Sequence, residues 1–294
     1  MALHYSVMLQ ETLEWLNPKE GQHFLDGTLG AAGHSLEISR RIGPSGRLLG
    51  LDVDESALDV ARDKLEEINN VSFYQLNFEN MAEALKKEAF SSLDGILLDI
   101  GVSSMQLDQA QRGFSFRDEN EGDLDMRMNQ SVGMPVKDYL KSVPKSELEK
   151  VIKEYGEERY YKRIANAIIE QRKIKKIETT KELAELIRKA IPGPRTKIDK
   201  ATRTFQALRI LINRELDVLK NAIEEAIKLL EVGGRLVIIS FHSLEDRIVK
   251  WSFRDLKDNG QAKILTKKPL LPSEKEMREN GRSRSAKMRV LEKI

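Results

Sequence analysis

Short apolar runs alternate with helical spacing along the first hundred residues. One run, from Leu93 to Asp99, is almost wholly apolar, which is typical of a strand buried on both faces of a parallel sheet. The same pattern predicts strands over residues 22–26, 47–52, 71–76 and 93–99, and helices over 33–41, 56–68 and 81–88. Alternation of this kind predicts a parallel sheet with right-handed crossovers.

The alternation stops after about residue 106. A polar loop over 112–135 is followed by helical patterns alone, at 146–155, 158–173 and 181–191. The α/β pattern then resumes with a long helix over 202–230 closed by Gly233-Gly234, a strand over 235–241, a helix over 244–256 and an antiparallel edge pair of 262–266 with 287–293. We therefore expect a doubly wound α/β domain made of 1–105 and 206–294, with an all-helical domain of 106–205 inserted for substrate recognition.

Composition narrows the chemistry. The 294 residues are 40% hydrophobic and 33% charged, which fits a folded core, and no apolar run is long enough to cross a bilayer. The absence of cysteine excludes disulfides, thiolate metal sites and cysteine nucleophiles, and with only four histidines we expect no metal. The first residues, Met1 to Tyr5, lack a basic-then-apolar leader, so we expect a cytoplasmic protein without a membrane partner.

The net charge of +2 conceals an uneven distribution. Residues 1–105 carry 8 basic and 17 acidic side chains, whereas 155–209 carry 15 and 7, and 257–294 carry 11 and 5. Two basic stretches beside a nucleotide-binding type of fold favour a nucleic-acid partner, although each arginine taken alone is more often a surface ion pair. The predicted phosphate contacts are Arg203, Arg209, Arg247, Arg282, Arg284 and Arg289.

A glycine-rich turn follows the first predicted strand. It runs from Leu25 to Ser35 as LDGTLGAAGHS and opens a helix, so its backbone can approach a ligand closely. Asp52 ends the second strand, where a carboxylate accepts hydrogen bonds from ribose hydroxyls; Asp54 competes for this role, and we favour Asp52 because it stands at the strand terminus. Nicotinamide enzymes and S-adenosylmethionine enzymes share this arrangement.

Later features favour the second class. Phe78 follows the third strand, where a ring can pack on adenine, and Asp99 ends the fourth strand at the edge where α/β folds bind ligands. No basic residue near the second strand suggests a 2′-phosphate site. The late unit of helix, Gly233-Gly234 and strand resembles the layout of class I, Rossmann-like methyltransferases.

Several long strings make a resemblance specific and nearly end to end. They are HYSVML at 4–9, the loop at 26–35, LDIGVSSMQLD at 98–108, RGFSF at 112–116, GEER at 156–159, ATRTFQALRI at 201–210, SFHSLEDR at 240–247 and RSAK at 284–287. In these strings the chain closely resembles the ribosomal RNA small subunit methyltransferase H family, the 16S rRNA cytosine-N4 methyltransferases.

The resemblance implies both a cofactor site and a substrate. The cofactor-binding positions it implies for S-adenosylmethionine are Ala32, Gly33, His34, Asp52, Phe78, Asp99 and Gln106. The substrate it implies is a cytidine in the decoding region of 16S rRNA, a component of the small ribosomal subunit. The chain departs from the usual pattern at four places: it has Ala31-Ala32 where a glycine is usual, Met105 and Gly281 where proline is usual, and Asp199-Lys200 in place of His-Pro.

The reaction so implied needs a group that accepts a hydrogen from the exocyclic N4 amine. Asp99, Ser103 and Ser104 lie just past the fourth strand, and His242 follows the fifth strand beside Glu245. We take Asp99, Ser103, Ser104 and His242 as candidate catalytic residues, with Asp99 first. For the two serines helix capping is an equal alternative, and a lone histidine is more often structural.

The roles of four apolar residues, and the function of the chain as a whole, stay open at this point. Phe114 and Phe116, in a charged loop, are candidates to stack a flipped base, whereas Phe205 and Leu208 fit the core of a helix. The chain also fits a nicotinamide dehydrogenase, or an assembly factor that binds RNA without catalysis. The sequence does not decide between naked RNA and an assembled subunit as substrate, nor does it fix the oligomeric state.

Overall fold

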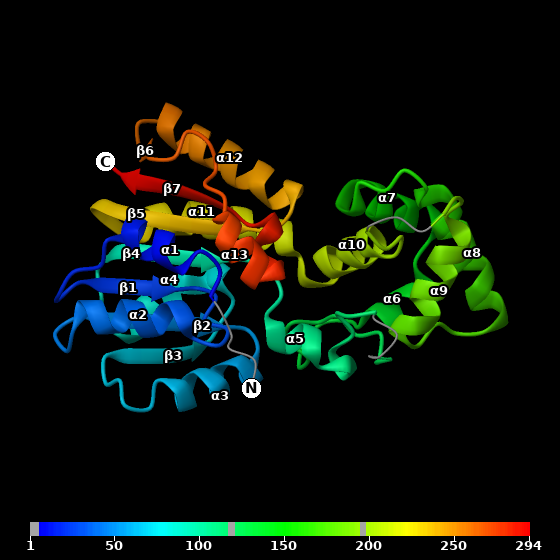
Figure 1. Cartoon of the computed structure of the whole chain (residues 1–294), viewed down its shortest axis with the longest axis horizontal. Helices are drawn as coiled ribbons and strands as arrows, with labels where there is room; N and C mark the ends of the chain where they lie inside the picture. The colour runs from blue at the N-terminus through cyan, green and yellow to red at the C-terminus, as the bar shows by residue number, and fades with distance from the viewer. Residues whose placement is uncertain (1–5, 117–120, 195–197) are drawn as a thin grey trace. The chain divides into compact units, whose positions relative to one another are not determined.

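Seven strands form one sheet in the described part of the computed structural model, which covers residues 6–116, 121–194 and 198–294 (Figure 1). Their order is β3-β2-β1-β4-β5-β7-β6. The first five pair in parallel, and β7 pairs antiparallel with both β5 and β6, which confirms the predicted closing pair at the sheet edge. The strands are β1 (His23–Asp26), β2 (Arg47–Asp52), β3 (Val71–Gln75), β4 (Leu93–Asp99), β5 (Leu230–Ser240), β6 (Ala262–Ile264) and β7 (Lys287–Lys293).

Helices cover both faces of this sheet. Alternate strand residues, such as Leu98 and Leu97, point to opposite faces and enter two separate apolar clusters. One cluster contains side chains of α4, α11 and α12, and the other contains side chains of α1 and α2. The helices of this unit are α1 (Leu9–Leu16), α2 (Gly33–Ile42), α3 (Glu55–Lys64), α4 (Met81–Lys87), α11 (Glu215–Leu229), α12 (Ser243–Asp258) and α13 (Glu274–Glu279), with 3-10 turns η1 (Phe78–Asn80) and η3 (Gly281–Ser285). The doubly wound α/β class is thereby confirmed.

A second unit has its own core and is helical in its described residues. Its elements are α5 (Ser104–Asp108), η2 (Ala110–Arg112), α6 (Val136–Ser142), α7 (Lys145–Gly156), α8 (Tyr161–Ile174), α9 (Thr180–Ala190) and α10 (Thr202–Asn213). Apolar side chains of α6 to α10 pack together there, including Leu148, Ile164, Leu183 and Leu208. Phe205 and Leu208 are buried in this core, as the sequence predicts.

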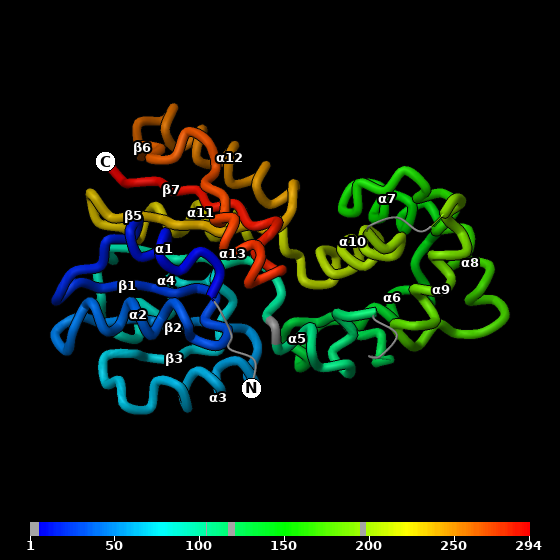
Figure 2. Tube along the Cα trace, viewed as in Figure 1, coloured from blue at the N-terminus to red at the C-terminus, as the bar shows by residue number. Residues whose placement is uncertain are grey.

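The chain enters the helical unit four residues before the expected bound of 106 and leaves it ten residues after the expected bound of 205. The first unit comprises Met1–Gly101 and Leu216–Ile294, and the second comprises Val102–Glu215. In Figure 2 the blue and cyan start of the chain and its yellow to red end therefore belong to one unit, while the green part forms the other. None of the helices in the described ranges is long and apolar enough to span a membrane.

One predicted element is wrong. The single helix expected over 202–230 is two helices, because Arg214 adopts a left-handed backbone (φ 51°, ψ 33°) that ends α10 and precedes α11. The side chain of Asn213 secures the break by donating to the carbonyl groups of Met126 and Arg209. Apolar residues keep helical spacing on both sides of the break, so the pattern alone conceals it.

The glycine pair Gly233-Gly234 also lies elsewhere than expected. It sits inside β5, at an irregularity where the pairing with β4 moves from Leu93–Leu230 to Gly95–Arg235. A Cβ on Gly234 would meet the carbonyl oxygen of Leu93 at 3.0 Å, so the backbones approach too closely there for a larger residue. The helices α1, α5, α6 and α13 are not anticipated by the sequence pattern.

Gly95 offers a test of how tightly the sheet is packed. A Cβ at this position would lie 2.3 Å from a ring carbon of Phe24, which is fully buried. We expect Gly95→Ala to lower the free energy of unfolding by about 1–3 kcal/mol, the usual cost of overpacking a core. Urea denaturation measures the change. Gly281→Ala, where no atom lies within 4 Å of the added methyl, is the matched control, and equal stability of the two variants would contradict this packing.

Candidate functional site

The turn after β1 is organised by Asp26, a carboxylate that is only 1% exposed. One of its oxygens accepts from the Ser35 hydroxyl at 2.6 Å, and the other accepts from the Thr28 amide at 3.1 Å. Burial raises the pKa of Asp26, and these hydrogen bonds oppose that shift. The strand end, the turn and the first turn of α2 are thus fastened to one buried group.

Asp52 at the end of β2 faces the same turn. Its two carboxylate oxygens accept from the backbone N–H groups of Gly30 and Asp54, each at 2.9 Å. Because a carboxylate has about four acceptor positions, both oxygens keep capacity for a further donor such as a hydroxyl. Burial raises the pKa of Asp52 to about 6.

Its competitor Asp54 has a structural task. Asp54 is the N-cap of α3, and its carboxylate accepts from the backbone N–H and the hydroxyl of Ser56 at 3.2 and 2.7 Å. Asp54 is buried under these contacts. This difference supports Asp52 as the ligand-binding carboxylate of the pair.

Asp99 ends β4, two strands from Asp52. Its backbone N–H donates to the Thr28 hydroxyl at 2.7 Å, which joins β4 to the turn. Its Oδ1 is buried, and within the described residues it has no hydrogen-bond partner. Burial raises the pKa of Asp99 well above its usual value, and the negative charges of Asp26 and Glu245 add to the effect. A buried acceptor without a donor points to a ligand that brings one.

His34 lies beside Asp99 at the start of α2. Its Nε2 is 3.0 Å from the carbonyl oxygen of Val7, and a carbonyl only accepts, so the ring proton is on Nε2. The other ring nitrogen, Nδ1, faces the Asp99 carboxylate at 3.8 Å. Two residues earlier, Ala32 is the N-cap of α2 and holds a left-handed backbone (φ 53°) in which glycine is strained less than alanine.

Phe78 and Gly27 complete the edge of the sheet. Phe78 begins η1 after β3 and is partly buried. A Cβ on Gly27 would lie 2.9 Å from the Cβ of Phe78 and 2.5 Å from the side chain of Leu98, so only glycine fits there. The turn thereby lies against β4 and against the ring that follows β3.

These groups suit a nucleoside that carries a cationic amine. Asp52 has acceptors for ribose hydroxyls, Asp99 has a buried oxygen that lacks a donor among the described residues, and Phe78 offers an apolar ring. All of them stand at the carboxyl ends of parallel strands, the edge where open α/β sheets bind ligands. The residues present therefore fit S-adenosylmethionine.

Comparison with known proteins decides the family. The model of the MraW methylase family matches residues 1–294. The chain belongs to this family. It is 45% identical over 307 residues to ribosomal RNA small subunit methyltransferase H of Clostridium botulinum (strain Kyoto / Type A2), with 99% of each chain covered, and 44% identical over 313 residues to the protein of that name from Clostridioides difficile (strain 630), with the same coverage.

A solved structure gives a weaker likeness. An rRNA methylase from Streptococcus thermophilus superposes with a TM-score of 0.46 at 12% identity, covering 97% of this chain and 93% of that one. The fold assignment rests on the strand order described above and not on this likeness. The resemblance drawn from the sequence motifs is confirmed by the MraW methylase family match, although His4 and Tyr5 of the first motif lie outside the described residues.

Three further predicted site residues belong to the helical unit. The Ser103 hydroxyl accepts from the Gln106 amide at 3.2 Å and the Gln106 side chain accepts from the Ser103 amide at 3.1 Å, so the two form a capping box for α5. Capping, the alternative to catalysis, is what the structure shows for Ser103. Ser104 opens α5, and its side chain is outside the described part. A catalytic role of Ser104 and a cofactor contact of Gln106 stay predictions.

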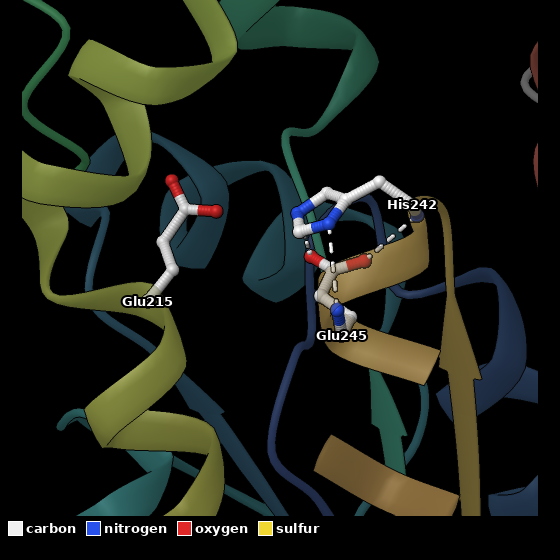
Figure 3. A group of neighbouring side chains, drawn as sticks. All are labelled: Glu215, His242 and Glu245. Atoms are coloured by element: carbon white, nitrogen blue, oxygen red, sulfur yellow. Dashed lines mark hydrogen bonds and ion pairs between the residues drawn. The ribbon is translucent and has the colours of Figure 1, made fainter. Parts of the chain in front are cut away.

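His242 is likewise part of a cap. It is the N-cap of α12, where its Nδ1 accepts from the Glu245 amide at 3.4 Å and the proton is therefore on Nε2. The Nε2 atom lies 3.0 Å from the buried Glu245 carboxylate, which also accepts from the amides of Phe241 and His242 (Figure 3). The Nδ1 atom is thus occupied by the cap, whereas the buried Nε2 makes no hydrogen bond among the described residues despite its closeness to Glu245. The capping contact favours a structural role over acid–base catalysis.

The predicted RNA-contacting arginines differ in exposure. Arg289 is only 8% exposed and its Nε donates to Asp246 at 2.7 Å, so the structure favours an internal ion pair for it. Arg209 forms two 2.8 Å hydrogen bonds to Glu215. The other four are exposed and stay candidates for phosphate contacts: Arg203, Arg247, Arg282 and Arg284.

Phe114 and Phe116 contribute to the core of the helical unit. Phe114 is buried in its apolar cluster, and the Phe116 ring packs on Phe205 with centroids 4.5 Å apart. Their structural surroundings favour packing over base stacking. Thr28, Ser35 and Val7, whose hydrogen bonds hold the site together, are not singled out by the sequence pattern. Serine and threonine close to an aspartate in sequence are common, and the Val7 contact is made by a backbone carbonyl. Neither gives a signal in the sequence, so only the fold reveals these contacts.

The cap at His242 yields a stability prediction. We expect His242→Ala to lower the free energy of unfolding by about 1 kcal/mol, the usual cost of removing an N-cap, while His242→Asn keeps an acceptor and stays near wild type. Urea denaturation measures both variants. Methyl transfer by the Ala variant, assayed where it is folded, should persist, and a complete loss of transfer there would show that His242 acts in catalysis instead.

Proposed function

We propose that this protein transfers a methyl group from S-adenosylmethionine to the exocyclic N4 of a cytidine in the decoding region of 16S rRNA. Membership of the MraW methylase family and the relatives named ribosomal RNA small subunit methyltransferase H support methylation of small-subunit rRNA. The choice of N4 and of the decoding region follows from the motif resemblance alone. One observation carries the proposal: Asp52, the glycine turn and Asp99 gather at one sheet edge.

The residues of this edge divide the binding task. Asp52 accepts from ribose hydroxyls, Phe78 packs against adenine, and the turn from Gly27 to Gly33 allows the backbone to approach the ligand. S-adenosylmethionine supplies a methyl group that its sulfonium already activates. The protein therefore contributes mainly position and electrostatics.

Asp99 is the acceptor for an amine N–H. Two donors are available in this reaction, the ammonium of the methionine moiety and the N4 amine of cytosine. A carboxylate that accepts from N4 localises the nitrogen lone pair, which is otherwise delocalised into the ring, and then takes the proton that the amine loses. The buried Oδ1 is the atom that serves this purpose.

The helical unit is proposed to recognise the RNA. Residues 155–209, which lie in it, carry 15 basic against 7 acidic side chains. Phosphate contacts supply much of the affinity of such proteins, so this excess favours RNA binding. The proposed partner is 16S rRNA within the small ribosomal subunit, in the cytoplasm.

Mass-spectrometric mapping tests the function directly. Small subunits from cells that lack the protein are incubated with S-adenosylmethionine and either wild type or a variant, and methyl groups are located on the rRNA. A new methyl on a decoding-region cytidine N4 supports the proposal. A methyl on another base, or a preference for NAD over S-adenosylmethionine in equilibrium binding, contradicts it.

Replacing Asp99 tests its role. We expect Asp99→Ala to reduce methyl transfer at least about a hundredfold, because a general acid–base group contributes about 10²–10⁴-fold. Calorimetric titration with S-adenosylmethionine then separates the two donors: unchanged affinity assigns Asp99 to N4, and weakened affinity assigns it to the methionine ammonium. Full activity of the variant would remove Asp99 from the site.

Asp52 predicts a pH dependence of donor binding. Its pKa is raised to about 6, so the free protein gains a proton there as the pH falls through 6. Ribose hydroxyls donate best to the ionised carboxylate, and we therefore expect the dissociation constant for S-adenosylmethionine to rise about fivefold between pH 6 and pH 5. Titration calorimetry of wild type and Asp52→Asn measures this. The Asn variant should bind weakly with a flatter profile, and a profile as steep as that of wild type would assign the proton to another group.

A further inference from the structure

A short N-terminal segment, Ser6 to Met8, lies between the start of α2 and the helix α13 near the other end of the chain. The Val7 carbonyl accepts from His34 Nε2 at 3.0 Å. The next residue, Met8, donates its backbone N–H to Glu276 Oε1 at 2.9 Å. Adjacent peptide groups thus connect a residue of the proposed donor site to a carboxylate 268 positions from Met8 in sequence.

The segment is tightly constrained. Met8 is fully buried and holds a left-handed backbone (φ 53°), and a Cβ on Gly33 would collide with the Ser6 hydroxyl at 1.8 Å. The left-handed conformation is unfavourable for a residue with a side chain, so the surrounding contacts must hold it in place. The hydrogen bond from Met8 to Glu276 is one such contact.

Glu276 is placed at an electrostatic cost. Burial raises its pKa, and the nearby charge of Glu11 raises it further. Glu276 is also among the negative charges that raise the pKa of Asp99. A half-buried acid near other acids does not stabilise the fold through its charge. The contribution of Glu276 is therefore the hydrogen bond that it accepts from Met8.

The sequence of contacts ends at the candidate site. Glu276 holds Met8, Val7 holds the Nε2 of His34, and the opposite nitrogen of that ring faces Asp99 at 3.8 Å. A displacement of the Val7 carbonyl would release the ring and remove the group that faces Asp99. Fixed ring orientation through a partner on the far nitrogen is a common way to position histidine.

We propose that Glu276 is a positioning residue for the methyl-donor site, acting through the backbone of Met8 and Val7 to fix His34 beside Asp99. The inference rests on the proposed function, since it takes S-adenosylmethionine as the ligand of that site. The competing explanation is that Glu276 only caps the first turn of α1, whose N-cap Met8 makes no side-chain cap. The two explanations differ in what happens to ligand affinity.

Titration calorimetry of the full-length protein with S-adenosylmethionine tests the proposal. We expect Glu276→Ala to weaken binding about five- to tenfold, and Glu276→Gln to stay within about twofold of wild type because its amide oxygen still accepts from Met8. The matched control is Glu274→Ala, an exposed glutamate on the same helix, which should bind as wild type does. Thermal unfolding of each variant verifies that it is folded at the titration temperature.

A double-mutant cycle shows whether Glu276 acts through His34. We expect His34→Phe to weaken binding by itself, and Glu276→Ala to add little in the presence of His34→Phe, since the ring to be positioned is gone. Fully additive losses would overturn the proposal. So would a Glu276→Ala variant that is less stable yet binds with wild-type affinity, which is the result that a purely capping role predicts.

The outcomes also separate this inference from the proposed function. If the wild-type protein binds no S-adenosylmethionine, the proposed function and the inference both fail. If wild type binds and methylates but Glu276→Ala matches it in affinity, only the inference fails.

Discussion

The hydrogen bonds of one buried carboxylate determine the geometry of the site. Asp26 fixes Ser35 of α2 and Thr28 of the turn, and the Thr28 hydroxyl in turn accepts from the Asp99 amide. With the turn held in this way, the Gly30 amide reaches the Asp52 carboxylate. The Asp26 carboxylate thereby fixes the ends of β1, β2 and β4 relative to one another, while its own oxygens accept hydrogen bonds from protein groups. Loss of Asp26 would consequently disturb Asp52 and Asp99 together.

Gathering acids at one edge has an electrostatic cost. The pKa values of Asp26, Asp52 and Asp99 are all raised, first by burial, and Asp26 adds its charge to the environment of the other two. A group whose pKa is raised by folding favours the folded state less as the pH rises through that value. At pH 7 these buried carboxylates therefore stabilise the folded protein less than uncharged side chains would at the same positions. A ligand that brings hydroxyl and cationic amine donors offsets this electrostatic cost. The affinity for such a ligand is therefore linked to the unfavourable burial of these carboxylates in the free site.

The sequence predicts what depends on local pattern. The strand Leu93–Asp99 and the helix starting at Gly33 have the predicted positions, because buried parallel strands and glycine turns have strong local signals. The break at Arg214 is hidden, since apolar spacing continues through it. The family motifs indicate the cofactor positions, yet they cannot separate ligand contacts from caps: Ser103 and His242 are both N-caps.

Contacts between distant parts of the chain lie beyond any local pattern. Glu276 belongs to a short helix with no motif of its own, and its partner Met8 is separated from it by almost the whole chain. Only the folded sheet brings the two ends to the same turn. The helical insertion follows Gly101, directly after the strand that ends in Asp99, and it carries its own apolar core. Because that core is separate from the clusters that pack on the sheet, residues of the insertion can vary without altering the hydrogen bonds that hold the sheet edge, which suits the RNA recognition proposed for this unit.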